Sequence, residues 1–166
     1  MKKKNNKKIM LFLTAILLIA LWSCNKSTDY EKEESELIQN YLSTHDTLDF
    51  VLKPSGLYYL EVLPGSGQEL VAHDTAYVKY IGAFLGGGIF DTNVGTTDTL
   101  VVPVNEGLLI SGFDEALTYM KEGGRAVVIL PSSLAYGPYG SYPYIPGFTP
   151  LLFDIAVVKV KHGPGK

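Results

Sequence analysis

The sequence predicts an α+β domain with an antiparallel sheet, preceded by an export segment and a polar stretch. Segments with strand composition outnumber the one internal segment with a helical pattern. Several of the connections are tight turns rich in Gly and Pro, and the chain has no internal repeat. Runs of strands joined by tight turns are typical of antiparallel sheets. The 166 residues are enough for one domain and a tether.

The first 23 residues have the composition of a signal peptide. MKKKNNKK carries five lysines in eight residues, and Ile9 to Trp22 is an apolar run of fourteen residues interrupted only by Thr14. A membrane-spanning helix needs about 20 apolar residues, so this run is short for a span. The residues before Cys24 are similar to the lipobox of bacterial lipoproteins, although Trp22 is unusual at its position. In such proteins the cysteine thiol is joined to a lipid by a thioether bond, the chain is cleaved before the cysteine, and the new amino group is acylated.

Cys24 is the only cysteine of the chain, so it has no disulfide partner. Lipidation explains this thiol and predicts a membrane-anchored lipoprotein of the bacterial cell envelope, on its periplasmic or surface side. The alternative is an ordinary secretory signal followed by a chance cysteine.

Removal of residues 1–23 leaves 9 basic and 17 acidic residues, a net charge of −8. This charge argues against nucleic acid as a partner and against a second, electrostatic membrane contact.

Residues 24–48 are predicted to hold the lipidated cysteine, a polar tether and a short helix. The stretch 25–36 is polar, and its acidic residues are expected to be solvated or to act as an export address: Asp29, Glu31, Glu33 and Glu34. Apolar residues at helical spacing predict an amphipathic helix near 33–43. The folded domain is expected over residues 49–166.

Five segments of this domain have strand patterns: 57–63, 75–83, 99–104, 125–130 and 151–161. Pro64-Gly65-Ser66-Gly67 ends the first of them in a turn. The last is largely apolar, which predicts a central strand. Between them a short helix carries an apolar stripe of Phe113, Ala116, Leu117 and Met120. Acidic residues lie in the first turn of this helix, and Gly123-Gly124 follows it.

The sequence lacks the residue patterns of most catalytic sites. The three histidines, at 45, 73 and 162, lie in polar stretches and are expected at the surface. No Cys/His cluster has the spacing of a zinc site, and Gly86-Gly87-Gly88 lacks the helix and lysine of a phosphate loop. An enzyme with this sequence therefore works without metal, cofactor or nucleophile. Rotation about an X-Pro bond allows this, because no covalent bond is made or broken.

Four segments, in this order and at this spacing, resemble the FKBP family of macrolide-binding prolyl isomerases: VKYIG (78–82), GGIFDTN (87–93), LLISGFDEALTYMKEGGRAVVILPSSLAYG (108–137) and IPGFTPLLFDI (145–155). The resemblance covers about residues 55–162. From Tyr80 to Phe153 the spacing of the family fits without insertion or deletion. Each segment alone is a weak signal, and the joint order is specific. The resemblance implies a twisted antiparallel β-sheet wrapped around one short α-helix.

The resemblance also implies an apolar pocket between sheet and helix that accepts a prolyl side chain. Transferred by position, the catalytic residues are Tyr80, Asp91 and Tyr136. The implied substrate-binding residues are Phe90, Leu100, Leu109, Ile110, Phe113, Tyr144, Ile145 and Phe153. Phe113 is the expected floor, and the Tyr136 hydroxyl and the Ile110 N–H are expected to donate hydrogen bonds to ligand carbonyls. Considered singly, Phe90, Leu100 and Phe153 would be core residues, Asp91 a turn cap and Tyr136 a loop aromatic.

The sequence departs from the family pattern at several of these positions. Phe113 replaces the usual Trp of the floor, and Leu100 replaces a usual Phe. A smaller floor is expected to lower activity or macrolide affinity. Residues 136–147 (YGPYGSYPYIPG), called here the tyrosine-rich loop, carry Ser141 where the family often has His and add three rim tyrosines, Tyr139, Tyr142 and Tyr144. We expect this loop to be a substrate-facing flap that alters substrate preference.

The function implied by the resemblance is peptidyl-prolyl cis-trans isomerisation in envelope or secreted proteins. Its partners would be proline-containing polypeptides, macrolide inhibitors and, through the lipid anchor, a membrane, with no cofactor and no metal. Two alternatives remain open. One is a non-catalytic peptide-binding or chaperone lipoprotein that retains the pocket, and the other is a structural envelope lipoprotein.

Overall fold

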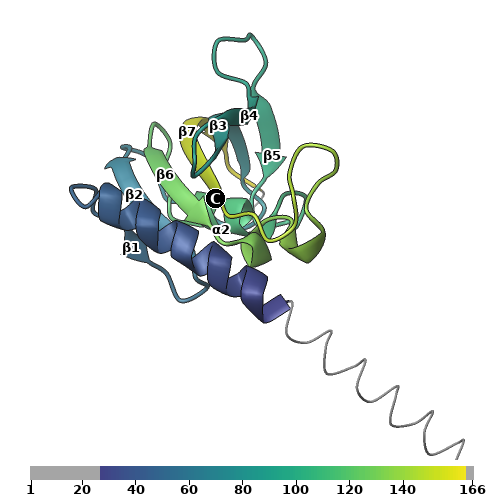
Figure 1. The fold of residues 1–166 in the computed structure, drawn as a ribbon. Helices are drawn as coiled ribbons and strands as arrows, with labels where there is room; N and C mark the ends of the chain where they lie inside the picture. Colours follow the sequence, from purple (N-terminus) through teal and green to yellow (C-terminus); the bar gives the residue numbers. More distant parts are fainter. Residues whose placement is uncertain (1–26, 164–166) are drawn as a thin grey trace, which may run out of the picture.

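The computed structural model describes residues 27–163, so the predicted signal peptide and Cys24 lie outside the described residues. A seven-stranded antiparallel sheet wraps around the short helix α2 (Ser111–Thr118), as Figure 1 shows. This confirms the predicted fold class. The strands are β1 (Val51–Leu52), β2 (Tyr58–Leu63), β3 (Thr75–Phe84), β4 (Ile89–Thr92), β5 (Leu100–Pro103), β6 (Arg125–Leu130) and β7 (Leu151–Lys161). Two 3₁₀ helices, η1 (Ser132–Leu134) and η2 (Gly137–Tyr139), lie between β6 and β7.

The order of strands in the sheet is β1-β2-β6-β7-β3-β4, and β5 also pairs with β3. The apolar strand β7 lies between β6 and β3, the central position that its composition predicted. The five predicted strands are all present. Sequence patterns missed β1 and β4, which have only two and four residues and are too short to show a period.

The long strand β3 pairs with β4 along one half and with β5 along the other, and Asn93 lies at the break between them. Its side-chain carbonyl accepts the N–H of Tyr80 at 2.8 Å, and its amide donates to the carbonyl of Val78 at 2.9 Å. The Asn93 side chain thus replaces the strand pairing that β4 would otherwise supply. Phe90 and Asp91 on β4 and Leu100 on β5, which line the cavity described below, are held on either side of this junction.

The core lies between α2 and the inner face of the sheet. The predicted apolar stripe is buried from Phe113 to Met120, but α2 ends at Thr118, so Met120 follows the helix instead of lying on it. Asp114, in the first turn, is also buried, and its carboxylate accepts the N–H groups of Asn105 at 3.2 Å and Gly107 at 2.9 Å. This acidic residue therefore fixes the loop that leads from β5 into α2.

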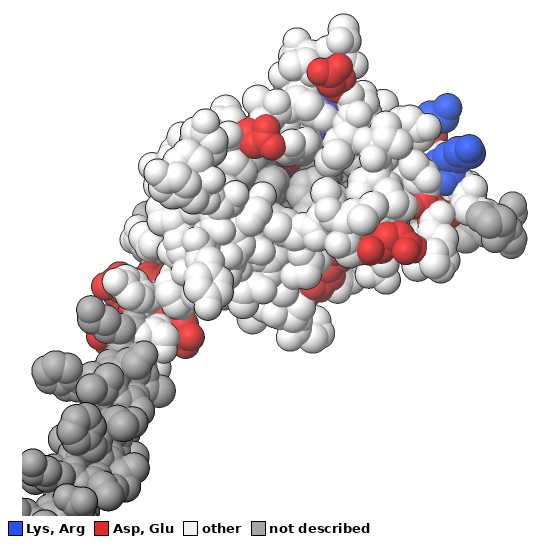
Figure 2. Space-filling model, turned by 90° about the vertical axis from the view of Figure 1, so that its right-hand side faces the viewer, with Lys and Arg blue, Asp and Glu red and all other residues white. Residues whose placement is uncertain are grey.

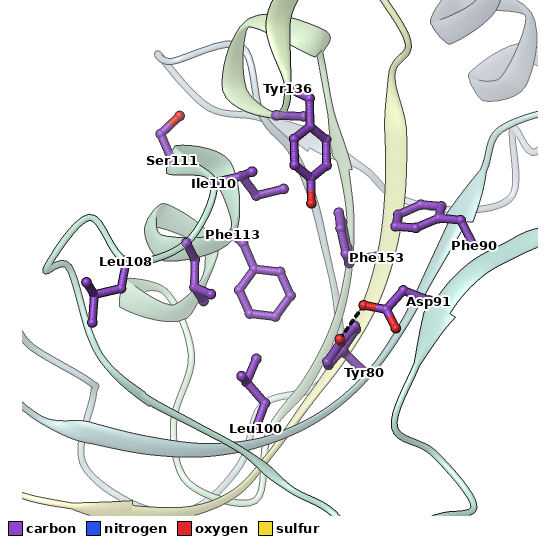
Figure 3. A pocket seen from close by; sticks show the side chains of 12 residues that line it. Tyr80, Phe90, Asp91, Leu100, Leu108, Ile110, Ser111, Phe113, Tyr136 and Phe153 are labelled. Carbon is purple, nitrogen blue, oxygen red and sulfur yellow. Dashed lines mark hydrogen bonds between the residues drawn. The ribbon is translucent and has the colours of Figure 1, made fainter. Parts of the chain in front are cut away.

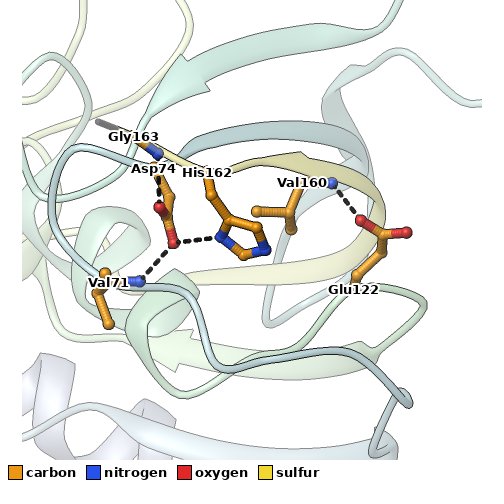
Figure 4. Close-up of polar contacts among 6 residues, drawn as sticks. All are labelled: Val71, Asp74, Glu122, Val160, His162 and Gly163. Atoms are coloured by element: carbon orange, nitrogen blue, oxygen red, sulfur yellow. Dashed lines mark hydrogen bonds and ion pairs between the residues drawn. The ribbon is translucent and has the colours of Figure 1, made fainter. Parts of the chain in front are cut away.

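Two carboxylates secure the far end of β7, as Figure 4 shows. Buried Asp74 accepts the N–H of Gly163 at 3.0 Å and that of Val71 at 3.1 Å, and it lies 3.2 Å from the Nδ1 of His162. Glu122 accepts the N–H of Val160 at 2.7 Å. The last strand is therefore tied to the chain segments that precede β3 and β6.

The N-terminal segment differs from its expected form. Residues 27–44 are already helical, whereas the sequence predicted a helix near 33–43 and a solvated stretch before it. This helix runs alongside β1 and β2 (Figure 1), and it buries Glu34 and Ile38 against the domain. Glu34 is not solvated, because its buried carboxylate accepts a hydrogen bond from the hydroxyl of Ser132 in the domain. Within residues 27–163, no helix combines the length and apolar character needed to cross a bilayer.

Candidate active site

A cavity of about 590 Å³ opens between α2, its preceding loop and the inner face of the sheet, as Figure 3 shows. Strands β3, β4, β5 and β7 supply one side of it, and the segments around α2 and η1 supply the other. The lining residues are Tyr80, Phe90, Asp91, Leu100, Leu108, Leu109, Ile110, Ser111, Phe113, Ala135, Tyr136 and Phe153. Most of the residues implied by the family resemblance are therefore brought together in one place.

Four aromatic rings form the base of the cavity. The buried ring of Phe113 packs edge-to-face on Phe153, with centroids 5.3 Å apart and an interplanar angle of 88°. Tyr80 meets Phe113 at 5.9 Å and 85°, and Phe90 meets Phe153 at 5.6 Å and 87°. Edge-to-face pairs of this kind are favourable, because the positive ring edge approaches the negative ring face. The rings therefore hold one another in fixed orientations around an apolar floor.

Gly82 on β3 is required for this packing. A Cβ atom at this position would lie 2.6 Å from the Phe90 ring and 3.0 Å from the Phe153 ring. Gly82 pairs with Phe153 across the sheet and with Asp91 on the other side, so it lies directly beneath the cavity wall. The absent side chain leaves the space that the Phe90 ring occupies.

Asp91 is the acidic residue among the described residues that line the cavity. The hydroxyl of Tyr80 donates to the Oδ2 of Asp91 across 2.6 Å, as the dashed line in Figure 3 marks. Burial, followed by this hydrogen bond and the negative charge of Asp91, raises the pKa of Tyr80 to about 12. Tyr80 therefore remains a hydroxyl donor throughout the physiological pH range, and it holds the Asp91 carboxylate at the edge of the cavity.

Two hydrogen-bond donors lie at the mouth of the cavity. The half-exposed Tyr136 directs its hydroxyl into the cavity, toward the space above Phe113 (Figure 3). The carbonyl of Ile110 accepts two backbone hydrogen bonds from the first turn of α2. Within residues 27–163 its N–H donates none, so that donor is available at the start of the helix. The site thus combines an aromatic floor with two hydrogen-bond donors at its mouth.

Tyr144 and Ile145 differ from the other expected site residues in their placement. Neither is among the lining residues: Tyr144 is exposed on the tyrosine-rich loop, and Ile145 is buried in the core. Contact of either residue with a substrate remains a prediction. Three further residues line the cavity and were not among those implied by the family resemblance: Leu108, Ser111 and Ala135. Each is the direct neighbour in the sequence of a residue that was identified, and this adjacency was the available signal.

The tyrosine-rich loop is compactly folded. Ser141 and Ile145 exchange backbone hydrogen bonds of 2.8 and 2.9 Å, and the N–H of Phe148 closes the loop on Gly137 at 3.0 Å. Gly140 has a φ of +66°, and a Cβ there would lie 2.1 Å from the carbonyl oxygen of Ile145. Only glycine fits this crossing of the chain on itself. The loop displays Tyr139 and Tyr142 almost completely, at 93% and 96% exposure.

Acidic side chains are scattered over the face in Figure 2, and basic side chains on it lie mainly at one edge. Within the described residues 27–163, no group of His, Cys, Asp or Glu side chains could hold a metal ion.

The cavity lining offers aromatic rings, aliphatic side chains and hydrogen-bond donors to a ligand. A largely apolar lining with a few placed polar groups is typical of binding pockets in proteins.

Residues 67–158, more than half of the chain, match the family described as FKBP-type peptidyl-prolyl cis-trans isomerase. The chain belongs to this FKBP family. An FK506-binding protein of Neisseria meningitidis serogroup B is 32% identical over 105 residues, which are 63% of this chain and 96% of that protein. The "Macrophage infectivity potentiator" of Trypanosoma cruzi is 36% identical over 116 residues, which are 69% of this chain and 58% of that protein.

FK506-binding protein 4 of Dictyostelium discoideum is 37% identical over 112 residues, which are 68% of this FKBP chain and 30% of that protein. The match therefore spans less than two thirds of the Dictyostelium and Trypanosoma relatives. The crystal structure of a peptidyl-prolyl cis-trans isomerase from Pseudomonas syringae pv. tomato is similar, with a TM-score of 0.68 and 27% identity. That likeness covers 80% of this chain and 94% of the other. The fold thus agrees with family membership.

Proposed function

We propose that this FKBP-type protein catalyses cis–trans isomerisation of X-Pro bonds in proline-containing polypeptides. The observation that carries the proposal is the aromatic cavity with the Tyr136 hydroxyl and the Ile110 N–H at its mouth. A prolyl ring is apolar, and the proline residue has no backbone N–H. It can therefore be buried against the aromatic floor without leaving an N–H that lacks an acceptor. The carbonyls that flank the ring can accept hydrogen bonds from the two donors.

The reaction requires the lowering of a torsional barrier. Rotation about the amide bond costs about 18–20 kcal/mol, because resonance is lost as the bond twists. The cis and trans forms of an X-Pro bond differ by only about 0.5–1 kcal/mol, so either direction is useful. The twisted amide has less charge separation than the planar one. A dry aromatic cavity therefore disfavours the planar form more, and interactions that favour the twisted form lower the barrier.

Each site residue has a distinct part in this proposal. Phe113 and Phe153 form the seat of the prolyl ring, and Phe90 and Leu100 limit its lateral movement. Tyr136 and the Ile110 N–H hold the carbonyls next to the ring as the amide rotates. Asp91 is fixed by Tyr80 at the cavity edge, where its charge faces the amide that twists. No proton needs to leave the protein in any step.

A refolding assay limited by proline isomerisation tests the proposal. The purified full chain should accelerate refolding, and Tyr136→Ala or Asp91→Ala should remove most of the acceleration. Asp98→Ala is the matched control for the second variant, because Asp98 is exposed and does not line the cavity. Suppression of aggregation without any acceleration would instead favour a non-catalytic chaperone.

We also propose that macrolides of the FK506 class bind the same cavity. Family membership and the aromatic floor support this. Because Phe113 offers a smaller surface than a Trp floor, we expect weaker binding than in relatives that carry Trp there. Titration of the isomerase rate with FK506 measures the affinity. An isomerase rate that stays unchanged at FK506 concentrations far above those that saturate such relatives would contradict the proposal.

We further propose that Cys24 is lipidated and anchors the protein to a membrane of the bacterial cell envelope. The short apolar run, the lipobox-like residues and the absence of a second cysteine support this. Two or more acyl chains hold a protein stably at a bilayer. Wild-type protein should incorporate radioactive palmitate and sediment with membranes, and Cys24→Ala should do neither. Equal labelling of the two forms would refute lipidation.

A further inference from the structure

The N-terminal helix contacts both ends of the chain segment that carries Tyr136 and the tyrosine-rich loop. At one end, the Glu34 carboxylate accepts two hydrogen bonds from Ser132, one from its hydroxyl at 2.7 Å and one from its backbone N–H. At the other end, the Tyr30 ring stacks on the Phe148 ring, with centroids 5.2 Å apart and an interplanar angle of 15°. These contacts join residues far apart in the sequence.

The contact at Ser132 is fully enclosed. Glu34 is 8% exposed and Ser132 is 5% exposed, so water does not compete for the carboxylate. Ser132 is the first residue of η1, and the preceding residue, Pro131, supplies no side-chain cap. Glu34 therefore satisfies backbone and side-chain donors that the local sequence leaves open. A buried donor that loses its acceptor is strongly unfavourable, so the contact restrains the start of η1.

The restraint reaches the cavity wall within one turn. The C-cap of η1 is Ala135, whose N–H donates to the carbonyl of Ser132 at 2.9 Å. Ala135 and Tyr136, which follow η1 directly, both line the cavity. From the other side, Ser111 donates to the carbonyl of Leu134 at 3.4 Å, so η1 is held between the N-terminal helix and the start of α2. The position of the Tyr136 hydroxyl thus depends on where η1 is fixed.

The contact at Phe148 fixes the return of the loop. Phe148 has a φ of +55°, which is unusual for an aromatic residue, and its N–H closes the loop on Gly137. Stacking by Tyr30 covers the ring of this constrained residue. The helix thereby restrains the tyrosine-rich loop where it begins and where it ends.

We propose that the N-terminal helix is a working part of the site and that Glu34 is a positioning residue for Tyr136. Glu34 does not touch the substrate. It holds Ser132, and through η1 it holds the wall that carries the Tyr136 hydroxyl. The inference rests on the proposed isomerase function, because the orientation of Tyr136 affects the rate only if the donor acts in the reaction.

The test uses the purified full chain with Glu34→Ala, Glu34→Gln and, as a matched control, Glu33→Ala. Glu33 is the exposed neighbour on the same helix. Displacement of a positioned group commonly costs a large factor in rate, so we expect Glu34→Ala to lower kcat/KM for a proline-containing peptide by about tenfold. The change should fall mainly on kcat, since the aromatic floor that seats the ring is untouched. Glu33→Ala should match the wild type.

Glu34→Gln should restore most of the lost rate, because its amide oxygen accepts the Ser132 N–H and its amide group donates to the Ser132 hydroxyl. Amide hydrogen exchange should be faster at residues 132–136 in Glu34→Ala, and unchanged in β7. Equal kcat/KM in Glu34→Ala and Glu33→Ala would overturn the inference. A loss that Gln does not restore, with faster exchange throughout β7, would also overturn it and assign Glu34 to general stability.

Failure of the proposed function has a different signature. A wild-type chain that does not accelerate proline-limited refolding would remove the isomerase proposal by itself. The exchange rates at residues 132–136 and the NMR signals of the Tyr136 ring would then still decide whether Glu34 positions the wall. Unchanged signals in Glu34→Ala would overturn the inference, and shifted signals that Glu34→Gln restores would support it.

Discussion

Gly82 is a residue at which one added methyl group would disturb the cavity. Gly82→Ala would bring a Cβ to 2.6 Å from the Phe90 ring, so the ring or the strand must move. We expect the free energy of unfolding to fall by about 1–3 kcal/mol, as in other overpacked interiors, and the affinity for proline-containing peptides to fall as well. Urea denaturation and peptide titration measure the two effects.

Gly86→Ala is the control for this variant, because a Cβ at Gly86 has no atom within 4 Å and its φ is not positive. It should change stability by no more than about 0.5 kcal/mol. Equal stability of the two variants would show that the Phe90 ring can move aside freely, contrary to our account of the floor.

The hydroxyl of Tyr80 provides a second prediction for a single residue. Because its pKa is raised to about 12, Tyr80 stays protonated below pH about 10, and kcat/KM should show no loss from its ionisation there. Tyr80→Phe removes the donor to Asp91 and should lower kcat/KM at every pH below that point by a constant factor. A ratio of wild-type to variant rates that changes between neutral pH and pH about 9 would contradict this assignment.

Among the elements, the connection between β4 and β5 is organised by one cation. The Lys79 ammonium group donates to the carbonyls of Asn93 at 3.2 Å and Thr96 at 2.9 Å, and to that of Asp98. We expect Lys79→Met to lower the free energy of unfolding by about 1–3 kcal/mol, because three carbonyls, of which that of Asn93 is partly buried, lose a charged donor. Amide exchange in residues 93–99 should become faster.

Lys161→Met is the matched control. It also removes one positive charge, and Lys161 is an exposed residue at the end of β7. Its effect on stability should stay within about 0.5 kcal/mol. If both variants lost the same stability, net charge rather than the three carbonyl contacts would explain the result.

The elements also show which parts of the fold sequence patterns can predict. The alternation of 75–83 and the apolar run 151–161 were long enough to predict β3 and β7, including the central place of β7. β4 could not be predicted from periodicity, because it is four residues long. It exists because β3 offers it a partner and Asn93 ends the pairing, which are tertiary effects.

For the molecule as a whole, two tyrosines with raised pKa values predict a loss of stability in alkali. Burial, and then the nearby charge of Glu61, raises the pKa of Tyr59 to about 12, and Tyr80 is raised to the same value. The folded state holds these protons more tightly than the unfolded chain, in which the pKa is near 10. Their contribution to stability is therefore complete below pH about 10 and is lost as the pH rises through about 12.

Urea denaturation at a series of alkaline pH values measures this decline. Tyr59→Phe should make it shallower, because one of the two groups no longer ionises. An identical pH dependence in wild type and variant would show that Tyr59 does not ionise upon unfolding.

The site as a whole could be predicted largely by the joint spacing of motifs, because that spacing places most of the cavity wall. Two placements could not be predicted. Glu34 belongs to a run of charged residues, a pattern typical of solvated surface, and its partner lies 98 residues away. Ile145 stands in a segment of Gly, Pro, Ser and Tyr that looks like open loop, and yet it is buried in the core.

The compact tyrosine-rich loop has a thermodynamic consequence. Ordering a flexible loop upon binding loses conformational entropy, which weakens association. This loop is already closed by the hydrogen bonds between Ser141 and Ile145, so a chain that lands on Tyr139 or Tyr142 loses only its own freedom. Chains that hold the extended polyproline conformation before contact lose least of all. Selectivity at this surface would then follow the stiffness of the arriving chain as much as its side chains.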